Sequence, residues 1–236
     1  MRWIALACAV ALSGCVATTQ APQPTKPTPT RQAAKKPTVP NKSQMASFSR
    51  VVRTMEPVAE RECRRRARGM NCDFKIVVDD RPGQPANAFQ TLDKSGRPIL
   101  AFNLAFIAQA RNQHELAFVM GHEAAHHISG HIARQRQNAT AGAILLGGIA
   151  AITGAGSGTI SSAQDIGAAV GARTYSKDFE LEADALGTVI TKRAGYDPVK
   201  GAQFFTQIPD PGNRFLGTHP PNAKRMETVI RVNNSL

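Results

Sequence analysis

The order of apolar and polar positions predicts a helix followed by a small sheet. Apolar residues recur every three to four positions from residue 46 to residue 68, which is the spacing of an amphipathic helix. Residues 74–79 are rich in β-branched side chains and run into a turn-forming segment, which predicts a strand. Residues 87–92 and 98–103 flank Asp93-Lys94-Ser95-Gly96, the pattern of a hairpin.

Two further helices are expected, at about residues 112–136 and 176–195, the second ending at Gly195. The segment between them, residues 139–172, places eight glycines among Ala, Ile, Leu and Ser. It is compatible with a buried helical hairpin, a mobile flap over a cleft, or a segment dipping into a membrane. The expected fold class is α+β and mostly helical, with a small antiparallel or mixed sheet beside the helix at 112–136.

The helix at 112–136 carries the motif H-E-A-A-H. His122 and His126 are four positions apart, so both imidazoles lie on one face of a helix and can bind one metal ion. Glu123 lies beside the same ion, where its carboxylate can take a proton from the attacking water. Catalytic zinc has three protein ligands, so one further ligand is required.

A histidine close by in the sequence does not satisfy this requirement. His131 is five positions after His126, about 140° away around a continuous helix. The residues a metzincin would need after the motif are also missing, because Ser129 and Ile132 occupy those positions. We therefore interpret His131 as structural.

A glutamate on the helix at 176–195 is the better third ligand. Glu180 and Asp184 are four positions apart on a stripe flanked by apolar residues, where an unpaired carboxylate is costly. Acidic residues in the first turns of a helix also complement its dipole, which is the alternative explanation. We predict Glu180 as a ligand and Asp184 as the residue that holds a ligand histidine by its second N–H. Glu182 is expected to face solvent.

These motifs resemble, as an ordered set, the gluzincin peptidases that include CAAX prenyl proteases, heat-shock protease X and periplasmic outer-membrane-assembly peptidases. The matching residues are His122-Glu123-Ala124-Ala125-His126, Glu180-Leu181-Glu182-Ala183-Asp184, and Thr218-His219-Pro220 with Arg225. The resemblance covers about residues 48–234 and implies a zincin-like fold with one Zn²⁺ per chain. It also implies that His219 and Arg225 act on the substrate or the oxyanion, or that His219 closes the metal site in a latent enzyme.

The N-terminal residues indicate export and a lipid anchor. One arginine, a short apolar run and small residues form a secretory signal that is too short to span a bilayer. Leu12-Ser13-Gly14-Cys15 is similar to a bacterial lipoprotein box, and Val16 favours the outer membrane. We expect a signal peptide at 1–14, a lipidated flexible tether at 15–45 with six prolines, and the catalytic domain at 46–236.

The distribution of charge bears on which partners the chain can bind, and the cysteines bear on its redox compartment. The net charge of +12 is spread over the tether and the run Arg64-Arg65-Arg66-Ala67-Arg68, without interleaved aromatic residues, which argues against nucleic acid. We interpret this charge as a solvated face. Cys63 and Cys72 remain after the signal peptide and the lipid account for the other two cysteines, and they predict a disulfide, with two free buried thiols as the alternative.

The function expected from these residues is a zinc endopeptidase on the periplasmic face of the outer membrane, acting on misfolded or unassembled envelope proteins. The alternative is a latent or inactive zinc-binding lipoprotein that serves as a chaperone or binding module, with His219 closing the site. A structural zinc site has four protein ligands and no open position, which separates the two hypotheses. One edge of the predicted sheet is expected to orient a peptide across the zinc, with Arg97 to Phe102 as the strand involved.

Overall fold

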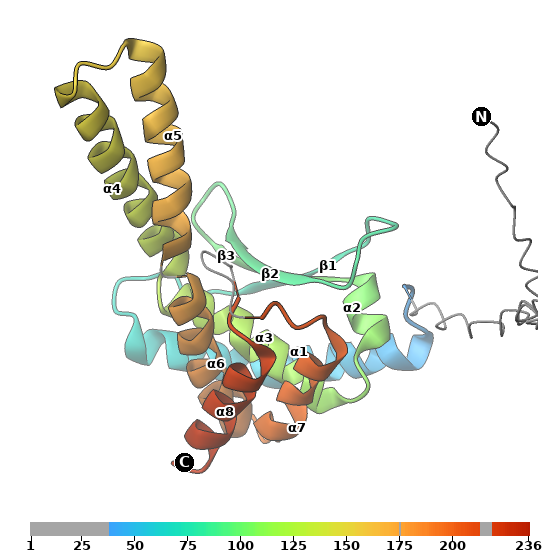
Figure 1. Cartoon of the computed structure of the whole chain (residues 1–236). Helices are drawn as coiled ribbons and strands as arrows, with labels where there is room; N and C mark the ends of the chain where they lie inside the picture. Colours follow the sequence, from blue (N-terminus) through green and yellow to red (C-terminus); the bar gives the residue numbers. More distant parts are fainter. Residues whose placement is uncertain (1–37, 175, 213–218) are drawn as a thin grey trace, which may run out of the picture. The chain divides into compact units, whose positions relative to one another are not determined.

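A computed structural model describes residues 38–174, 176–212 and 219–236 of the chain. The expected signal peptide, Cys15 and the tether up to residue 37 lie outside the described residues, as does Thr218. All described residues belong to one compact unit, and Figure 1 shows its elements. They are α1 (Lys42–Arg66), β1 (Lys75–Asp79), β2 (Ala88–Leu92), β3 (Pro98–Asn103), α2 (Leu104–Gln109), α3 (Gln113–Ile128), α4 (His131–Ile152), α5 (Ser157–Thr174), α6 (Ser176–Arg193), α7 (Pro198–Ala202), the short 3₁₀ helix η1 (Gln203–Gln207) and α8 (Asn222–Asn233).

The expected α+β fold class is confirmed, with α3 at the centre of the unit. This helix packs against α1, α6 and α7, and also contacts β2 and β3. In Figure 1 the sheet lies on one side of α3. Helices α6, α7 and α8 lie on the other side of α3. Helix α1 begins at Lys42, earlier than expected, because Asn41 and Gln44 form a reciprocal capping box.

The sheet is mixed and has three strands in the order β1-β3-β2. The predicted hairpin is confirmed, because β2 pairs antiparallel with β3. Strand β1 pairs with β3 in parallel, so both edges of β3 are occupied. The expectation that residues 97–102 offer a free edge to a peptide is therefore wrong, since these residues form the central strand.

The predicted helix over residues 112–136 is also interrupted. Helix α3 ends at Ile128, and Gly130 adopts a left-handed conformation with φ of 65° before α4 begins at His131. Glycine adopts this conformation without steric cost, so the chain changes direction there. The motif helix and the glycine-rich segment are consequently two separate elements.

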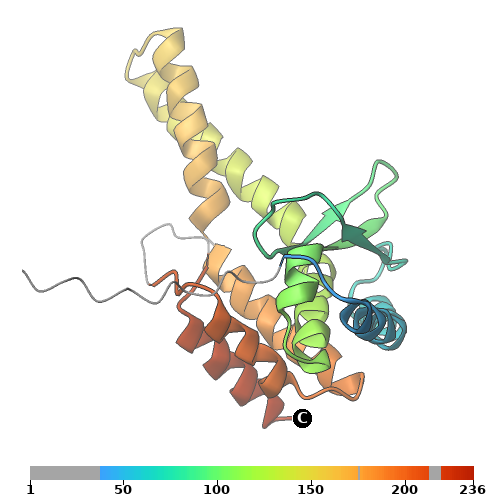
Figure 2. The ribbon, with the colours of Figure 1, turned by 90° about the vertical axis from the view of Figure 1, so that its right-hand side faces the viewer.

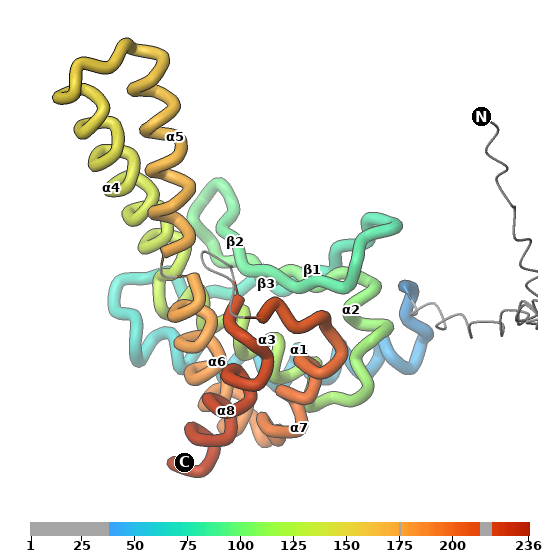
Figure 3. The backbone as a smooth tube through the Cα atoms, in the orientation of Figure 1, coloured from blue at the N-terminus to red at the C-terminus, as the bar shows by residue number. Residues whose placement is uncertain are grey.

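The segment between the two motif helices forms an antiparallel hairpin of α4 and α5 that extends away from the rest of the unit (Figures 2 and 3). The segment is a helical hairpin, as one of the three alternatives expected, but the hairpin is not buried. Among its residues only His131, Gly147 and Gly167 are buried. No helix of the described chain is long and apolar enough to cross a membrane.

The basic run at the end of α1 is only partly a solvated face. Arg65 and Arg66 pair with Glu62, whose side chain is buried, and Arg193 of α6 pairs with the same carboxylate. A buried carboxylate requires such partners. Arg193 therefore links α6 to α1 through Glu62, while Arg65 and Arg66 pair with this carboxylate within α1 and also carry surface charge.

The predicted disulfide joins Cys63, in the last turn of α1, to Cys72, just before β1. It closes a loop with a sequence separation of nine residues. We expect Cys63→Ala/Cys72→Ala to lower the free energy of unfolding by about 2–3 kcal/mol, from the loop entropy regained by the unfolded chain. Urea unfolding of the two proteins measures this difference. A reducing agent should destabilise only the parent protein, and equal stability of both would contradict the prediction.

Candidate metal centre

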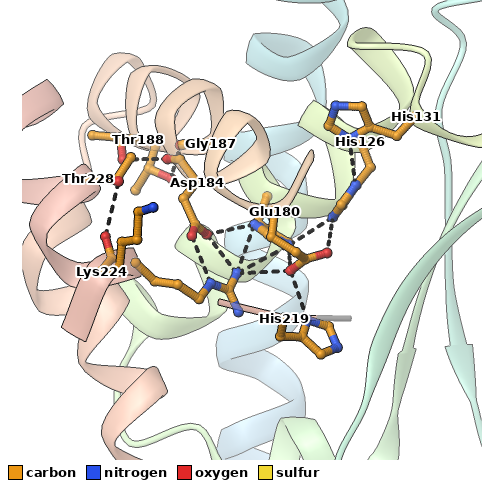
Figure 4. Close-up of polar contacts among 12 residues, drawn as sticks. His126, His131, Glu180, Asp184, Gly187, Thr188, His219, Lys224 and Thr228 are labelled. Carbon is orange, nitrogen blue, oxygen red and sulfur yellow. Dashed lines mark hydrogen bonds and ion pairs between the residues drawn. The ribbon is translucent and has the colours of Figure 1, made fainter. Parts of the chain in front are cut away.

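Two helices bring three metal-ligating side chains together. His122 and His126 on α3 have their Nε2 atoms 3.0 Å apart. Glu180 on α6 places Oε2 3.6 Å from His122 Nε2 and Oε1 3.3 Å from His126 Nε2. Figure 4 shows His126, Glu180 and His219 converging on one region. These three side chains, which could hold a metal ion, are the candidate ligands predicted from the sequence.

The spacing of these three donors fits a zinc ion. Zinc in tetrahedral coordination, with bonds of about 2.0–2.1 Å, places its ligand atoms about 3.3 Å apart. The donor atoms of His122, His126 and Glu180 all lie within 4.8 Å of one another, and no other such group occurs in the part of the chain that the structure describes. Two imidazoles and a carboxylate are also the donor types zinc prefers in catalytic sites.

The close approach of α3 and α6 depends on two glycines. A Cβ atom on Gly121 would lie 2.9 Å from the carbonyl oxygen of Gly187, and one on Gly187 would lie 2.9 Å from the backbone nitrogen of His122. Real Cβ atoms essentially never come this close to backbone atoms. The glycine pair thus sets the distance between the two histidines and Glu180.

Gly187→Ala should therefore weaken metal binding without touching a ligand. The added methyl group pushes α6 away from α3, which moves Glu180 away from the histidines, and we expect zinc affinity to fall at least tenfold. Competition with a chromophoric chelator measures it. Gly148→Ala is the matched control, because nothing lies within 4 Å of the methyl group at that helical position. Equal zinc affinity of both variants and the parent would contradict the proposed role of the glycine pair.

Asp184 lies where the prediction placed it, beneath the histidines. The fully buried Asp184 has Oδ1 2.9 Å from His122 Nδ1, so His122 can direct Nε2 towards the metal position. Burial lowers the pKa of His122, but Asp184 and Glu180 more than offset this effect and raise that pKa to about 10. A metal ion binds a histidine that has lost this proton, so metal and proton compete at His122.

Arg225 lines the cavity in front of the candidate centre, and its side chain is largely buried. Its Nε and Nη2 each donate to a different oxygen of Asp184 at 2.7 Å, and the guanidinium stacks on the ring of Phe205 at 3.9 Å. Nη2 also lies 3.4 Å from Glu180 Oε2. The side chain is buried, and these contacts place Arg225 as a support for the two carboxylates.

His219 is placed on the open side of the centre. Its side chain is half exposed, and Nδ1 lies 3.1 Å from Glu180 Oε2. Burial would raise the pKa of Glu180, but hydrogen bonds from His122, His126 and His219 hold this pKa well below its usual range. His219 is therefore near enough to contact either a bound substrate or the metal position.

A cavity of about 450 Å³ opens in front of these residues. Glu123 lines it and is largely buried, and the segment Ala86 to Gln90 forms another wall. This segment includes the start of β2, which pairs with β3 along one edge and has no strand partner on the other within the described residues. The sheet edge next to the candidate centre thus belongs to β2.

His131 is not part of the group of potential metal ligands, as the sequence analysis expected, but it contacts one of them. Its Nδ1 lies 2.8 Å from His126 Nδ1, its ring stacks on Phe179, and Nε2 lies 3.2 Å from Glu182 Oε2. Burial lowers the pKa of His131 to about 4, so the ring is neutral at pH 7 and its Nδ1 can accept a hydrogen bond from the Nδ1–H of His126. The rotation angle that separated the two histidines assumed a continuous helix. The turn at Gly130, itself a recognisable helix-ending residue, brings His131 back to His126.

Glu182 is exposed, as expected, but it is paired. Its Oε2 lies 2.7 Å from Arg134 Nη1, and the guanidinium of Arg134 covers the ring of Phe179 at 4.3 Å. Glu182, His131 and His126 thus form a continuous series of contacts that ends at the metal position. The series fixes the orientation of the His126 ring from the side opposite the metal.

An H-E-x-x-H helix with a glutamate from a second helix defines the gluzincin class of metallopeptidases. Residues 46–232 match the model of peptidase family M48, and the chain belongs to this family.

Two curated relatives carry names that describe an activity. The chain is 32% identical over 138 residues to the putative beta-barrel assembly-enhancing protease of Vibrio cholerae serotype O1, covering 52% of this chain and 26% of that protein. It is 30% identical over 152 residues to the beta-barrel assembly-enhancing protease of Escherichia coli O157:H7, covering 55% of this chain and 29% of that protein. The chain thus matches less than a third of the length of either relative.

Proposed function

We propose that this protein is a zinc-dependent endopeptidase. The observation that carries the proposal is the convergence of His122, His126 and Glu180 at distances that suit tetrahedral zinc, in a cavity lined by Glu123. Membership of peptidase family M48 supports the same activity. Three protein ligands leave one position for the reaction, as in catalytic rather than structural zinc sites.

The roles of the protein groups follow from their positions. A zinc ion held by His122, His126 and Glu180 would supply Lewis acidity for peptide hydrolysis at neutral pH. Glu123 takes the proton of the attacking water and passes it to the leaving amine. His219 lies on the open side, where its imidazole can donate to the developing oxyanion. Asp184 and Arg225 hold His122 and Glu180 in place.

The free edge of β2 is the proposed support for the substrate backbone. An extended peptide adds to an exposed strand edge through main-chain hydrogen bonds, and residues 88–90 of β2 line the cavity. This replaces the predicted role of residues 97–102. A peptide bound there would pass in front of Glu123 and the histidines.

The location and substrates are proposed from the sequence and the relatives. The signal at residues 1–14 and the box that ends at Cys15 support a lipid anchor on the periplasmic face of the outer membrane. The relatives are named for enhancing β-barrel assembly, which supports quality control of misfolded or unassembled envelope proteins. Protein substrates, rather than nucleic acid, are the proposed partners.

A latent form of the same enzyme is the second candidate. Its supporting observation is His219 Nδ1 at 3.1 Å from Glu180 Oε2, close to the metal position. If His219 occupies the fourth coordination position, the protein binds zinc without hydrolysing peptides, as a binding or chaperone lipoprotein would. Release of His219 would then be the activating step.

Degradation of casein by the zinc-loaded protein tests both candidates, with the parent and His219→Ala compared side by side. Cleavage by the parent that stops on chelation and returns with zinc supports the active endopeptidase. Cleavage by His219→Ala alone supports latency. If neither protein cleaves casein while zinc is bound, the endopeptidase proposal fails and the binding lipoprotein is favoured.

A further inference from the structure

The α4–α5 hairpin exposes an unusual amount of apolar surface. Six of the twelve large apolar side chains exposed in the described chain lie on it: Ile144, Leu145, Ile149, Ile152, Ile166 and Val170. Contiguous exposed apolar patches on soluble proteins mark interaction sites, whereas single exposed apolar residues are ordinary. Because these side chains are concentrated on one projecting element, we expect this surface to contact another molecule.

The packing of the hairpin makes this exposure unavoidable. A Cβ atom on Gly142 would lie 2.1 Å from the carbonyl oxygen of Gly167, and one on Gly171 would lie 2.1 Å from that of Asn138. The two backbones are in direct contact, which leaves no room for large side chains between the helices. The branched side chains consequently point outwards, while each helix satisfies its own backbone hydrogen bonds.

Most of the hairpin is almost free of charged residues, and two arginines border this uncharged zone. From residue 139 to residue 172 the only charged residue is Asp165, although about a quarter of the residues in a soluble domain are ordinarily charged. Arg136 and Arg173 stand just before and just after this zone, and both are exposed. Because Gly171 packs on Asn138, these two arginines lie at a similar height on the hairpin.

The hairpin has an apolar end next to a pair of arginines, and a layer of anionic lipids likewise has an apolar interior next to a negatively charged surface. Cationic side chains are favoured at the height of anionic headgroups, and aliphatic side chains are favoured among the acyl chains. Residues 139–152 of α4 span about 21 Å as a helix, while the hydrocarbon of one leaflet is about 15 Å thick. The hairpin thus suits partial insertion into one leaflet, which the charge of Asp165, inside the apolar zone, opposes.

We propose that the α4–α5 hairpin inserts its apolar end into a phospholipid layer that contains anionic lipids. For its location the inference rests on the proposed lipid anchor at Cys15. Twenty-two residues separate Cys15 from the first described residue, and a chain of this length can span at most about 70 Å at about 3.1 Å per residue, which is enough for this contact. Ile132 and Gln135 at the root of the hairpin line the cavity, so insertion holds the metal centre near the lipid surface.

Insertion is tested with a tryptophan placed on the hairpin. Residues 16–236 contain every described element but neither Cys15 nor Trp3, the only tryptophan of the chain. Ile149→Trp in this chain reports on the hairpin, and Ile230→Trp, at an exposed apolar position of α8, is the matched control. With phosphatidylglycerol vesicles, we expect the emission of the Ile149→Trp variant to shift to shorter wavelength and to be quenched by brominated acyl chains. The control should show neither change.

Binding strength gives a second measurement. We expect vesicle flotation to fall at least tenfold in the triple variant Ile144→Ser/Leu145→Ser/Ile152→Ser. Flotation should also fall in Arg136→Gln/Arg173→Gln, and its dependence on salt should weaken. In Asp165→Asn, flotation should be preserved or strengthened. Casein cleavage in solution by these variants should equal that of the parent. The lipid measurement needs no activity, so it can fail or succeed independently of the proposed peptidase function.

Several outcomes would overturn the proposal. Absence of quenching in the Ile149→Trp variant, or equal quenching of this variant and the control, would exclude insertion of the hairpin. A lipid-independent shift that grows with protein concentration would identify a second copy of the chain as the partner. Loss of casein cleavage in the triple serine variant, without vesicle binding by the parent, would identify the hairpin as a surface for unfolded polypeptide.

Discussion

Glu123→Gln is expected to reduce peptide hydrolysis by about 10²–10⁴-fold while metal binding and stability stay unchanged. Glu123 is next to His122 in the sequence, lines the cavity and is largely buried, so its carboxylate is held beside the metal position. Glutamine has nearly the same size but cannot accept and return a proton. The substitution therefore removes the general base and leaves the packing around residue 123 unchanged.

The measurement is the rate of casein cleavage by zinc-loaded protein, or by zinc-loaded His219→Ala if the parent is latent. Zinc content and urea unfolding of the same preparations are measured in parallel. Glu227→Gln is the matched control, because it makes the same change on α8, away from the cavity lining. Cleavage by Glu123→Gln within tenfold of the parent, with zinc bound, would remove Glu123 from the role of general base.

The sequence predicted the parts of the site that depend on local geometry. Positions four apart on a helix share a face whatever the rest of the fold does, so His122 with His126, and Glu180 with Asp184, could be paired in advance. The apolar flanks of Glu180 and Asp184 indicated burial, and burial of a carboxylate implied a partner. The pairing of the two helices was inferred from the third ligand that the histidines require, and the family resemblance supported it, because helix phase alone does not specify which faces meet.

The sequence-based predictions that failed depended on where the chain turns or which strands meet. The left-handed residue Gly130 divides a predicted single helix, and this turn returns His131 to His126. The expected free edge at residues 97–102 failed because β1 pairs with β3 in parallel, although β2 lies between these two strands in the sequence.

The glycine-rich segment illustrates a different difficulty. Its sequence left a buried hairpin, a mobile flap and a membrane contact open, and only the buried hairpin follows from the usual place of aliphatic side chains in a core. The glycines instead bring the two backbones into contact and use up the space between the helices, as Gly142 and Gly167 show. Periodicity predicts that a helix is amphipathic, but it does not distinguish an apolar face that packs on protein from one that packs on lipid.

Asp184→Ala is expected to lower the free energy of unfolding by about 3–5 kcal/mol, since it leaves the buried Arg225 without its carboxylate. Arg225 donates to both oxygens of Asp184 at 2.7 Å, and His122 Nδ1 lies 2.9 Å from Oδ1. Zinc affinity should also fall about 10–100-fold, because His122 loses the group that orients its ring. Urea unfolding of metal-free protein and zinc competition measure the two effects separately.

The double variant Asp184→Leu/Arg225→Met separates these two contributions of Asp184. Replacing both members of a buried ion pair with apolar side chains is often neutral for stability, so the double variant should regain most of the stability lost in Asp184→Ala. It should not regain zinc affinity, because His122 still lacks its acceptor. If zinc affinity returned together with stability, Asp184 would serve the metal centre only through the fold. If neither returned, the apolar pair would have failed to pack in the space between α6 and α8.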